Sequence, residues 1–312
     1  MSTEPDPTDG GHRSVIAAFL ANLGIALAKF VGFLATGAAS MAAEAVHSVA
    51  DTGNQGLLLF GERRSRQQPT REHPFGYGRE RYFWSFVVAV VLFTAGGLFA
   101  LFEAEEKLRH PHELESPAWA IGILAVAFCL EAWSLRTAVR ASRHDKGPGS
   151  WWRFIRESKR AELPVVLLED TGALIGIVFA LTGVTLATLT DNPRFDALGS
   201  MAIGILLVAI ALTLAIEMKS LLIGEAATDE QIAAIRHAIE SDPHVARLLE
   251  LRTQQLAPDD TLVAARLQVD DSLAGRELVS VIKAIEDRIH EVAPEAHRVY
   301  LQPAIPPDGA VS

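Results

Sequence analysis

Six long apolar runs constrain the fold of this 312-residue chain more than any other feature. They lie at about 14–36, 41–60, 82–102, 117–139, 163–187 and 196–218. Each approaches or exceeds the ~20 residues that an α-helix needs to cross the hydrocarbon core of a bilayer. Six buried helices of a soluble enzyme fit the pattern poorly, because helices of soluble proteins normally keep a polar stripe toward water. We therefore expect an integral membrane protein with six transmembrane helices.

The distribution of lysine and arginine predicts the orientation of these helices. Six arginines lie between the second and third runs, and eight basic residues lie between the fourth and fifth runs and at their ends. The alternate loops hold only Lys107, Arg109 and Arg194. Because basic residues concentrate in cytoplasmic loops, we expect a multi-pass protein of the cell membrane with both termini in the cytoplasm.

The pattern changes after Ile223 from long apolar runs to short mixed segments. These segments predict, in order, a helix at 228–242, strands at 244–256 and 261–271, a helix at 274–294 and a strand at 296–304. The expected fold class is membrane α-helical, with a cytoplasmic αββαβ domain of ferredoxin- or metallochaperone-like type. The predicted parts are a polar tail at 1–13, the transmembrane domain at 14–223, the cytoplasmic domain at 224–305 and a tail at 306–312.

Much of the excess acid behind the net charge of −10 lies in the predicted cytoplasmic domain. This charge argues against nucleic acid as a partner. The chain also lacks the G-x-x-x-x-G-K-[ST] phosphate loop of many nucleotide-binding proteins. We therefore expect the lipid bilayer to be a partner, and neither nucleic acid nor a nucleotide.

Ionisable residues interrupt the second and fifth apolar runs, where they are costly and therefore indicate function. His47 and Asp51 are four residues apart, so they lie one turn apart on one face of a helix. Glu44 falls near the same stripe, and the fifth run carries Glu169 and Asp170. Imidazole and carboxylate groups together are a ligand set for a divalent transition metal such as zinc.

Other interpretations of these residues remain open. His47 and Asp51 also suit hydrogen bonds to neighbouring helices, together with Thr52, Asn54 or Gln55. Glu169 and Asp170 diverge by ~100° on a helix, so we expect only one of them to face the same centre. Glu131, in the fourth run, suits either the translocation cavity or a helix contact with an arginine such as Arg136.

The segments SMAAEAVHSVADTGNQGLLLFG, HPFGYGRERYFW and LLEDTGALIG, with the αββαβ tail, resemble the cation diffusion facilitator family of divalent-metal/proton antiporters. The resemblance covers about residues 14–303 and suggests a divergent, zinc-transporter-like branch. In that family the second and fifth spans each supply two metal ligands. The resemblance thus implies ligand roles for His47, Asp51 and Asp170, and a cytoplasmic domain that forms a homodimer.

Val166 stands where zinc-transporting members of that family commonly have histidine. The fourth ligand therefore stays open among Glu169, Glu44 and water. The family's further metal positions in the tail are occupied here by Leu249, Arg266, Leu301 and Pro303, which are poor ligands.

These observations predict a secondary transporter that exports a divalent cation, Zn²⁺ foremost, in exchange for protons. Mn²⁺, Fe²⁺ and Co²⁺ also suit one imidazole with carboxylates. The alternatives are a membrane-embedded metal-dependent enzyme, or a metal channel or sensor. The chain has no H-E-x-x-H or G-x-S-x-G motif to favour the enzyme.

Overall fold

A computed structural model describes residues 23–111, 116–146 and 149–305. The predicted tails at 1–13 and 306–312 lie outside the described residues. The chain divides into two compact units, one reaching Arg63 and continuing over Phe83–Met218, the other formed by Arg64–Tyr82 with the chain from Lys219 onward. We call them the membrane unit and the C-terminal unit.

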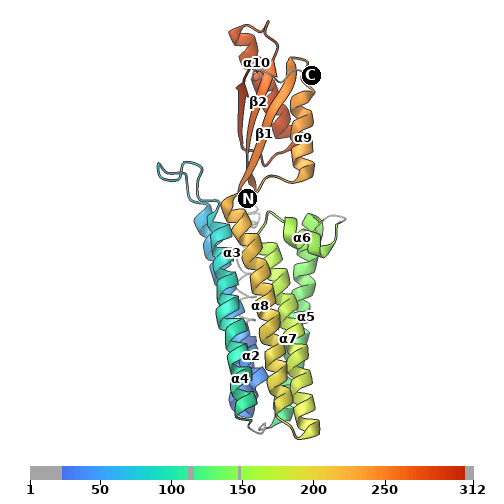
Figure 1. The fold of residues 1–312 in the computed structure, drawn as a ribbon. Coiled ribbons are helices and arrows are strands. Elements are labelled where there is room, and N and C mark those ends of the chain that lie inside the picture. Colours follow the sequence, from blue (N-terminus) through green and yellow to red (C-terminus); the bar gives the residue numbers. More distant parts are fainter. Residues whose placement is uncertain (1–22, 112–115, 147–148, 306–312) are drawn as a thin grey trace, which may run out of the picture. The chain divides into compact units, whose positions relative to one another are not determined.

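The membrane unit is helical, and its long helices run alongside one another in Figure 1. The helices are Leu23–Thr36, α2 (Ala39–Ser65), α3 (Glu80–Val91), the π-helical η1 (Leu92–Leu98), α4 (Phe99–Arg109), α5 (Pro117–Lys146), the short α6 (Trp151–Glu157), α7 (Glu162–Thr190) and α8 (Arg194–Ile223). The segments α3, η1 and α4 form one continuous helix.

Four helices of the described chain are long and apolar enough to cross a membrane. They are Glu80–Arg109, Pro117–Arg140, Glu162–Thr190 and Arg194–Ile223. A fifth apolar helix is described over Leu23–Thr36. The remaining predicted span, the second run at 41–60, corresponds to α2, whose 27 residues include the polar candidate site. A helical membrane domain is therefore confirmed, and the count of six spans stays a prediction.

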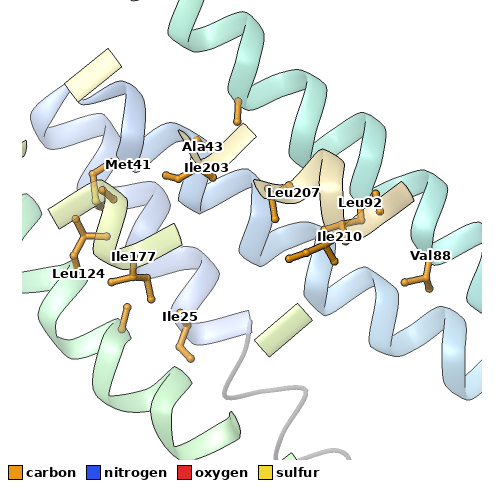
Figure 2. Close-up of a cluster of buried hydrophobic side chains, with 14 of the residues drawn as sticks. Ile25, Met41, Ala43, Val88, Leu92, Leu124, Ile177, Ile203, Leu207 and Ile210 are labelled. Atoms are coloured by element: carbon orange, nitrogen blue, oxygen red, sulfur yellow. The ribbon is translucent and has the colours of Figure 1, made fainter. Parts of the chain in front are cut away.

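Aliphatic side chains and small residues form the core of the membrane unit. Met41, Leu124, Ile177, Ile203 and Leu207 belong to one buried cluster (Figure 2). Glycines bring η1 and α8 close together, since a Cβ atom on Gly97 would collide with Val208. Close approach of this kind is the usual way in which membrane helices associate without a hydrophobic driving force.

The C-terminal unit contains the predicted order of helices and strands. Its elements are α9 (Asp229–Glu240), β1 (Val245–Ala257), β2 (Asp260–Val269), α10 (Gly275–Val292) and β3 (Arg298–Pro303). The sheet order is β1-β2-β3, with β1 antiparallel and β3 parallel to β2. Both helices pack on one face of this sheet, because Ile235, Ile239, Ile285 and Ile289 share a core with Val263 and Leu267.

The link between α8 and α9 contains Gly224, whose φ of 115° is one that residues with a side chain rarely adopt. Thr228 then caps α9. Its side-chain oxygen accepts a hydrogen bond from the Gln231 backbone, and the Gln231 side chain accepts one from the Thr228 backbone. This reciprocal pair satisfies two backbone donors at the start of the helix, so Thr228 is the N-cap of the helix that we predicted at 228–242.

The loop before α3 packs within the C-terminal unit. The Arg298 guanidinium lies 5.8 Å from the centre of the Phe75 ring and donates a 3.2 Å hydrogen bond to the Phe75 carbonyl oxygen. Arg298 also forms an ion pair with Asp260, and Arg81 lies 3.8 Å from Asp259. One arginine of β3 therefore holds the loop and the start of β2 together.

Candidate metal site

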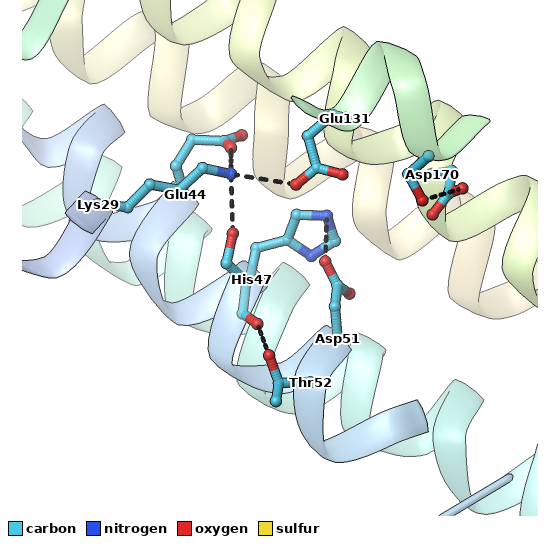
Figure 3. Close-up of polar contacts among 9 residues, drawn as sticks. Lys29, Glu44, His47, Asp51, Thr52, Glu131 and Asp170 are labelled. Atoms are coloured by element: carbon cyan, nitrogen blue, oxygen red, sulfur yellow. Dashed lines mark hydrogen bonds and ion pairs between the residues drawn. The ribbon is translucent and has the colours of Figure 1, made fainter. Parts of the chain in front are cut away.

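Helix α2 carries the two candidate ligands that are one turn apart. His47 Nε2 lies 3.5 Å from Asp51 Oδ2, as their four-residue spacing predicts. The His47 side chain is fully buried, and Asp51 is about 15% exposed. The helix thus presents an imidazole and a carboxylate side by side inside the membrane unit (Figure 3).

The start of α2 is held by residues of two other helices. Asp196 of α8 accepts hydrogen bonds from the backbone N–H groups of Ala39 (2.7 Å) and Ser40 (3.3 Å), and from the Ser40 hydroxyl. Lys107 of α4 donates a 2.6 Å hydrogen bond to the carbonyl oxygen of Gly37. A buried carboxylate therefore caps α2 and also complements the positive end of its dipole.

A small polar cavity brings α2, α5 and α7 together. It is lined by Ile25, Ser48, Asp51, Gln55, Glu131, Val166, Glu169 and Asp170. The cavity offers about 20 Å³ to the centre of a water-sized sphere, which is enough for one water molecule or one ion. Four carboxyl groups from three helices therefore border one small space.

Glu169 and Asp170 both line this cavity, whereas we expected only one of them to face the centre. The two side chains leave α7 ~100° apart, and donors from two other helices direct both of them. Asn54 donates a 2.6 Å hydrogen bond to Glu169, and Ser134 of α5 donates a 2.9 Å hydrogen bond to Asp170. These two donors fix the direction of both carboxyl groups.

Several buried polar atoms of α2 have no hydrogen-bond partner among the described residues. They are both ring nitrogens of His47, Oδ1 of Asp51, Oε1 of Glu44 and Oδ1 of Asn54. Leaving such groups buried and unpaired costs ~1–3 kcal/mol each. The alternative role of His47 and Asp51 in joining helices is weakened, because Asn54 bonds to Glu169 and Thr52 bonds to the Ser48 backbone.

The candidate ligands do not form a closed coordination sphere in the described residues. Across the described ranges, no group of three histidine, cysteine, aspartate or glutamate side chains is close enough to hold one metal ion. The donor chemistry nonetheless suits zinc, which binds imidazole nitrogen and carboxylate oxygen at ~2.0–2.2 Å. Coordination by these residues would require the side chains around the cavity to move inward.

Lys29, in the first helix, was missed by our sequence analysis. Its ammonium group is fully buried and lies 3.0 Å from Glu44 Oε2, 2.8 Å from the Ser48 hydroxyl and 3.8 Å from Glu131 Oε1 (Figure 3). Glu131 therefore lines the cavity and has Lys29 as its cation, where we had considered Arg136. The signal was present in the sequence as a lysine within the apolar run LGIALAKFVGFLA.

Comparison with known families matches both parts of the chain. Residues 15–223 match the cation efflux transmembrane domain, and residues 227–303 match the cytoplasmic domain of cation efflux proteins. The chain belongs to the cation efflux family. This membership confirms the predicted cation diffusion facilitator family, which is a family of transporters and not of enzymes.

Three relatives illustrate the range of this family. The human mitochondrial proton-coupled zinc antiporter SLC30A9 is 34% identical over 251 residues, which are 80% of this chain and 44% of the relative. Metal tolerance protein C4 of Arabidopsis thaliana is 30% identical over 79% of this chain and 54% of its own length. The cation-efflux pump FieF of Serratia proteamaculans is 27% identical over 79% of this chain and 77% of its own. The chain thus spans less than half of the zinc antiporter.

Proposed function

We propose that this chain exports a divalent metal cation, Zn²⁺ foremost, from the cytoplasm in exchange for protons. The observation that carries this proposal is the pair His47 and Asp51. Their buried atoms lack hydrogen-bond partners among the described residues, and the cavity beside them is bordered by acids of α7. The proposed ligands are His47, Asp51, Asp170 and Glu169.

Proton exchange follows from the chemistry of these ligands. A metal ion binds neutral imidazole and ionised carboxylate, so binding displaces protons and proton binding displaces the metal. A proton gradient can then drive export if the site opens alternately to the two sides of the membrane. The zinc antiporter among the relatives, described as proton-coupled, supports this assignment.

The remaining parts of the proposal concern the membrane and the assembly. The basic loops favour the cell membrane with both termini in the cytoplasm, although the human relative is mitochondrial. The match to the cytoplasmic domain of cation efflux proteins supports a homodimer formed through the C-terminal unit. Mn²⁺, Fe²⁺ and Co²⁺ are the other candidate substrates.

The test is zinc uptake by proteoliposomes that contain the full chain and carry an inwardly directed metal gradient and an opposing proton gradient. We expect saturable uptake that depends on the proton gradient and is lost in Asp51→Ala and in His47→Ala. Asp287→Asn, on the exposed face of α10, is the matched control and should transport normally. Uptake that persists in both site variants, or that is passive and independent of protons, would contradict the proposal.

A further inference from the structure

Lys29 is a fully buried cation next to a cluster of acids. Its ammonium group lies within 4 Å of Glu44 and Glu131 and donates a hydrogen bond to the Ser48 hydroxyl. Glu44 is itself fully buried. A buried ammonium group is tolerated only where acceptors and opposite charge surround it, and here three other side chains provide them.

The position of Lys29 divides the acids of the membrane unit into two groups. Glu44 Oε2 accepts its hydrogen bond from Lys29, so this oxygen is already occupied. Glu131 lies between Lys29 and the cavity, which it lines together with Asp51, Glu169 and Asp170. The acids of α7 are instead fixed by the neutral donors Asn54 and Ser134.

This division matters for the choice of metal. A cage with many carboxylate oxygens suits hard cations such as Mg²⁺ and Mn²⁺, whereas zinc accepts fewer ligands and binds imidazole well. Asp51, Glu169 and Asp170 already supply carboxylate oxygens around the cavity. Glu44 and Glu131, if available, would raise their number further relative to the single imidazole of His47. An ammonium group that binds both acids reduces the number of oxygens and the negative charge that an entering ion meets.

We propose that Lys29 is a selectivity-determining positioning residue that pairs with Glu44 and Glu131 and so limits their coordination of the transported ion. This inference rests on the proposed function of the same site. It assigns Lys29 the task of favouring a metal that accepts imidazole nitrogen over hard cations that prefer oxygen. Lys29 acts through the two acids and does not itself contact the metal.

The test compares metal selectivity in Lys29→Met and Lys29→Arg with that of the wild type. Full-length protein in proteoliposomes is assayed for Zn²⁺ uptake in competition with Mn²⁺ and, separately, with Mg²⁺. Lys29→Met should increase the relative preference for Mn²⁺ over Zn²⁺ by about tenfold, because it releases two acids close to a divalent ion. Lys29→Arg retains the charge and should keep the preference within about threefold of the wild type.

A second variant separates selectivity from folding. Lys29→Met combined with Glu44→Gln removes a cation and an anion together, so it buries no additional charge. This pair should shift the preference toward Mn²⁺ by less than Lys29→Met alone, because only Glu131 is released. It also keeps the inference testable if Lys29→Met fails to fold.

Three results would overturn the inference in distinguishable ways. Folded Lys29→Met that loses Zn²⁺ and Mn²⁺ uptake equally would show that Lys29 only joins helices. An unchanged preference in the double variant, where Lys29→Met does not fold, would have the same meaning. A wild type that moves no divalent cation would instead refute the proposed function, and the inference would fall with it.

Discussion

The two units of this chain use charged side chains in opposite ways. In the membrane unit, Lys29, Glu44 and His47 are fully buried, and acids of α2, α5 and α7 border a cavity. In the C-terminal unit, ion pairs such as Lys283–Asp287 and Arg252–Glu250 lie at the surface. Buried charges are costly unless they are paired, whereas exposed pairs contribute little. The difference indicates that the buried charges of the membrane unit are kept for function, whereas these exposed pairs of the C-terminal unit are solvated surface groups.

The hydrogen bonding of buried side chains also differs between the two units. His47 has two ring nitrogens without hydrogen-bond partners among the described residues. Arg298, the central arginine of the C-terminal unit, bonds to Asp260 and to the Phe75 carbonyl oxygen. Two buried atoms of the C-terminal unit, Asp260 Oδ1 and Arg288 Nε, also lack a partner there, but both side chains form an ion pair through another atom. Neither ring nitrogen of His47 has a hydrogen bond among the described residues, which supports placing the binding chemistry in the membrane unit.

The largest effect that this comparison predicts belongs to Asp170. Asp170→Asn keeps the shape of the side chain but removes a charge that borders the cavity. We expect zinc transport to fall by about 100-fold or more, since changes to groups that merely support metal ligands already cost 10–100-fold. Uptake by proteoliposomes measures this loss. Asp191→Asn, at the exposed C-terminal end of α7, is the matched control, and an equal loss there would break the comparison.

The next effect concerns the buried cap of α2. Asp196→Ala removes the acceptor for the backbone N–H groups of Ala39 and Ser40. We expect the protein to lose ~1–3 kcal/mol of stability, together with part of its transport, because α2 carries both His47 and Asp51. Thermal unfolding of the full chain in detergent measures the first quantity. Unchanged stability would show that the capping bonds are dispensable.

A smaller effect is expected in the C-terminal unit at Arg298. Arg298→Ala removes its ion pair with Asp260 and its contacts with Phe75. We expect faster amide hydrogen exchange in β2, β3 and the loop, equivalent to ~1–2 kcal/mol, because the hydrogen bonds involve a charged group. Mass spectrometry on the full-length protein resolves this region. Arg252→Ala, at an exposed arginine of β1, serves as control and should leave exchange unchanged.

The smallest effect is expected at Lys283. A hydrogen bond to Asp287 raises the pKa of Lys283, so any stabilisation from the pair is complete at neutral pH and is lost only as pH rises through this pKa in the alkaline range. The pair is exposed. At each pH between 6 and 9, Lys283→Ala should therefore show the same hydrogen exchange in α10 as the wild type. A pH-dependent difference in that interval would show that surface pairs matter more here than we infer.

Local patterns explain which parts of the fold were predictable. The start of α9 at Thr228 depends on neighbours in the sequence, and four of the apolar runs are recognisable by length and composition alone. The positions of the three strands along the chain follow from short alternating segments in the same way. Each of these features is determined within a short window of the chain, so the sequence analysis identified it without knowledge of tertiary contacts.

The unpredicted features all depend on contacts between helices. The partner of Glu131 is Lys29, about one hundred residues earlier in the chain. Asp196 caps a helix that begins 157 positions before it. Glu169 and Asp170 both line the cavity because donors from α2 and α5 fix them. Periodicity within one helix carries no information on such partners.

The central claim is that one imidazole and carboxyl groups from two membrane helices hold the transported ion. Anomalous diffraction at the zinc edge, on crystals of the full-length protein grown with Zn²⁺, tests it most directly. The account predicts one zinc ion within ~2.0–2.2 Å of His47 and of carboxylate oxygens from Asp51 and from α7. Zinc bound in the membrane unit without His47 and Asp51, or held by α2 alone, would contradict it.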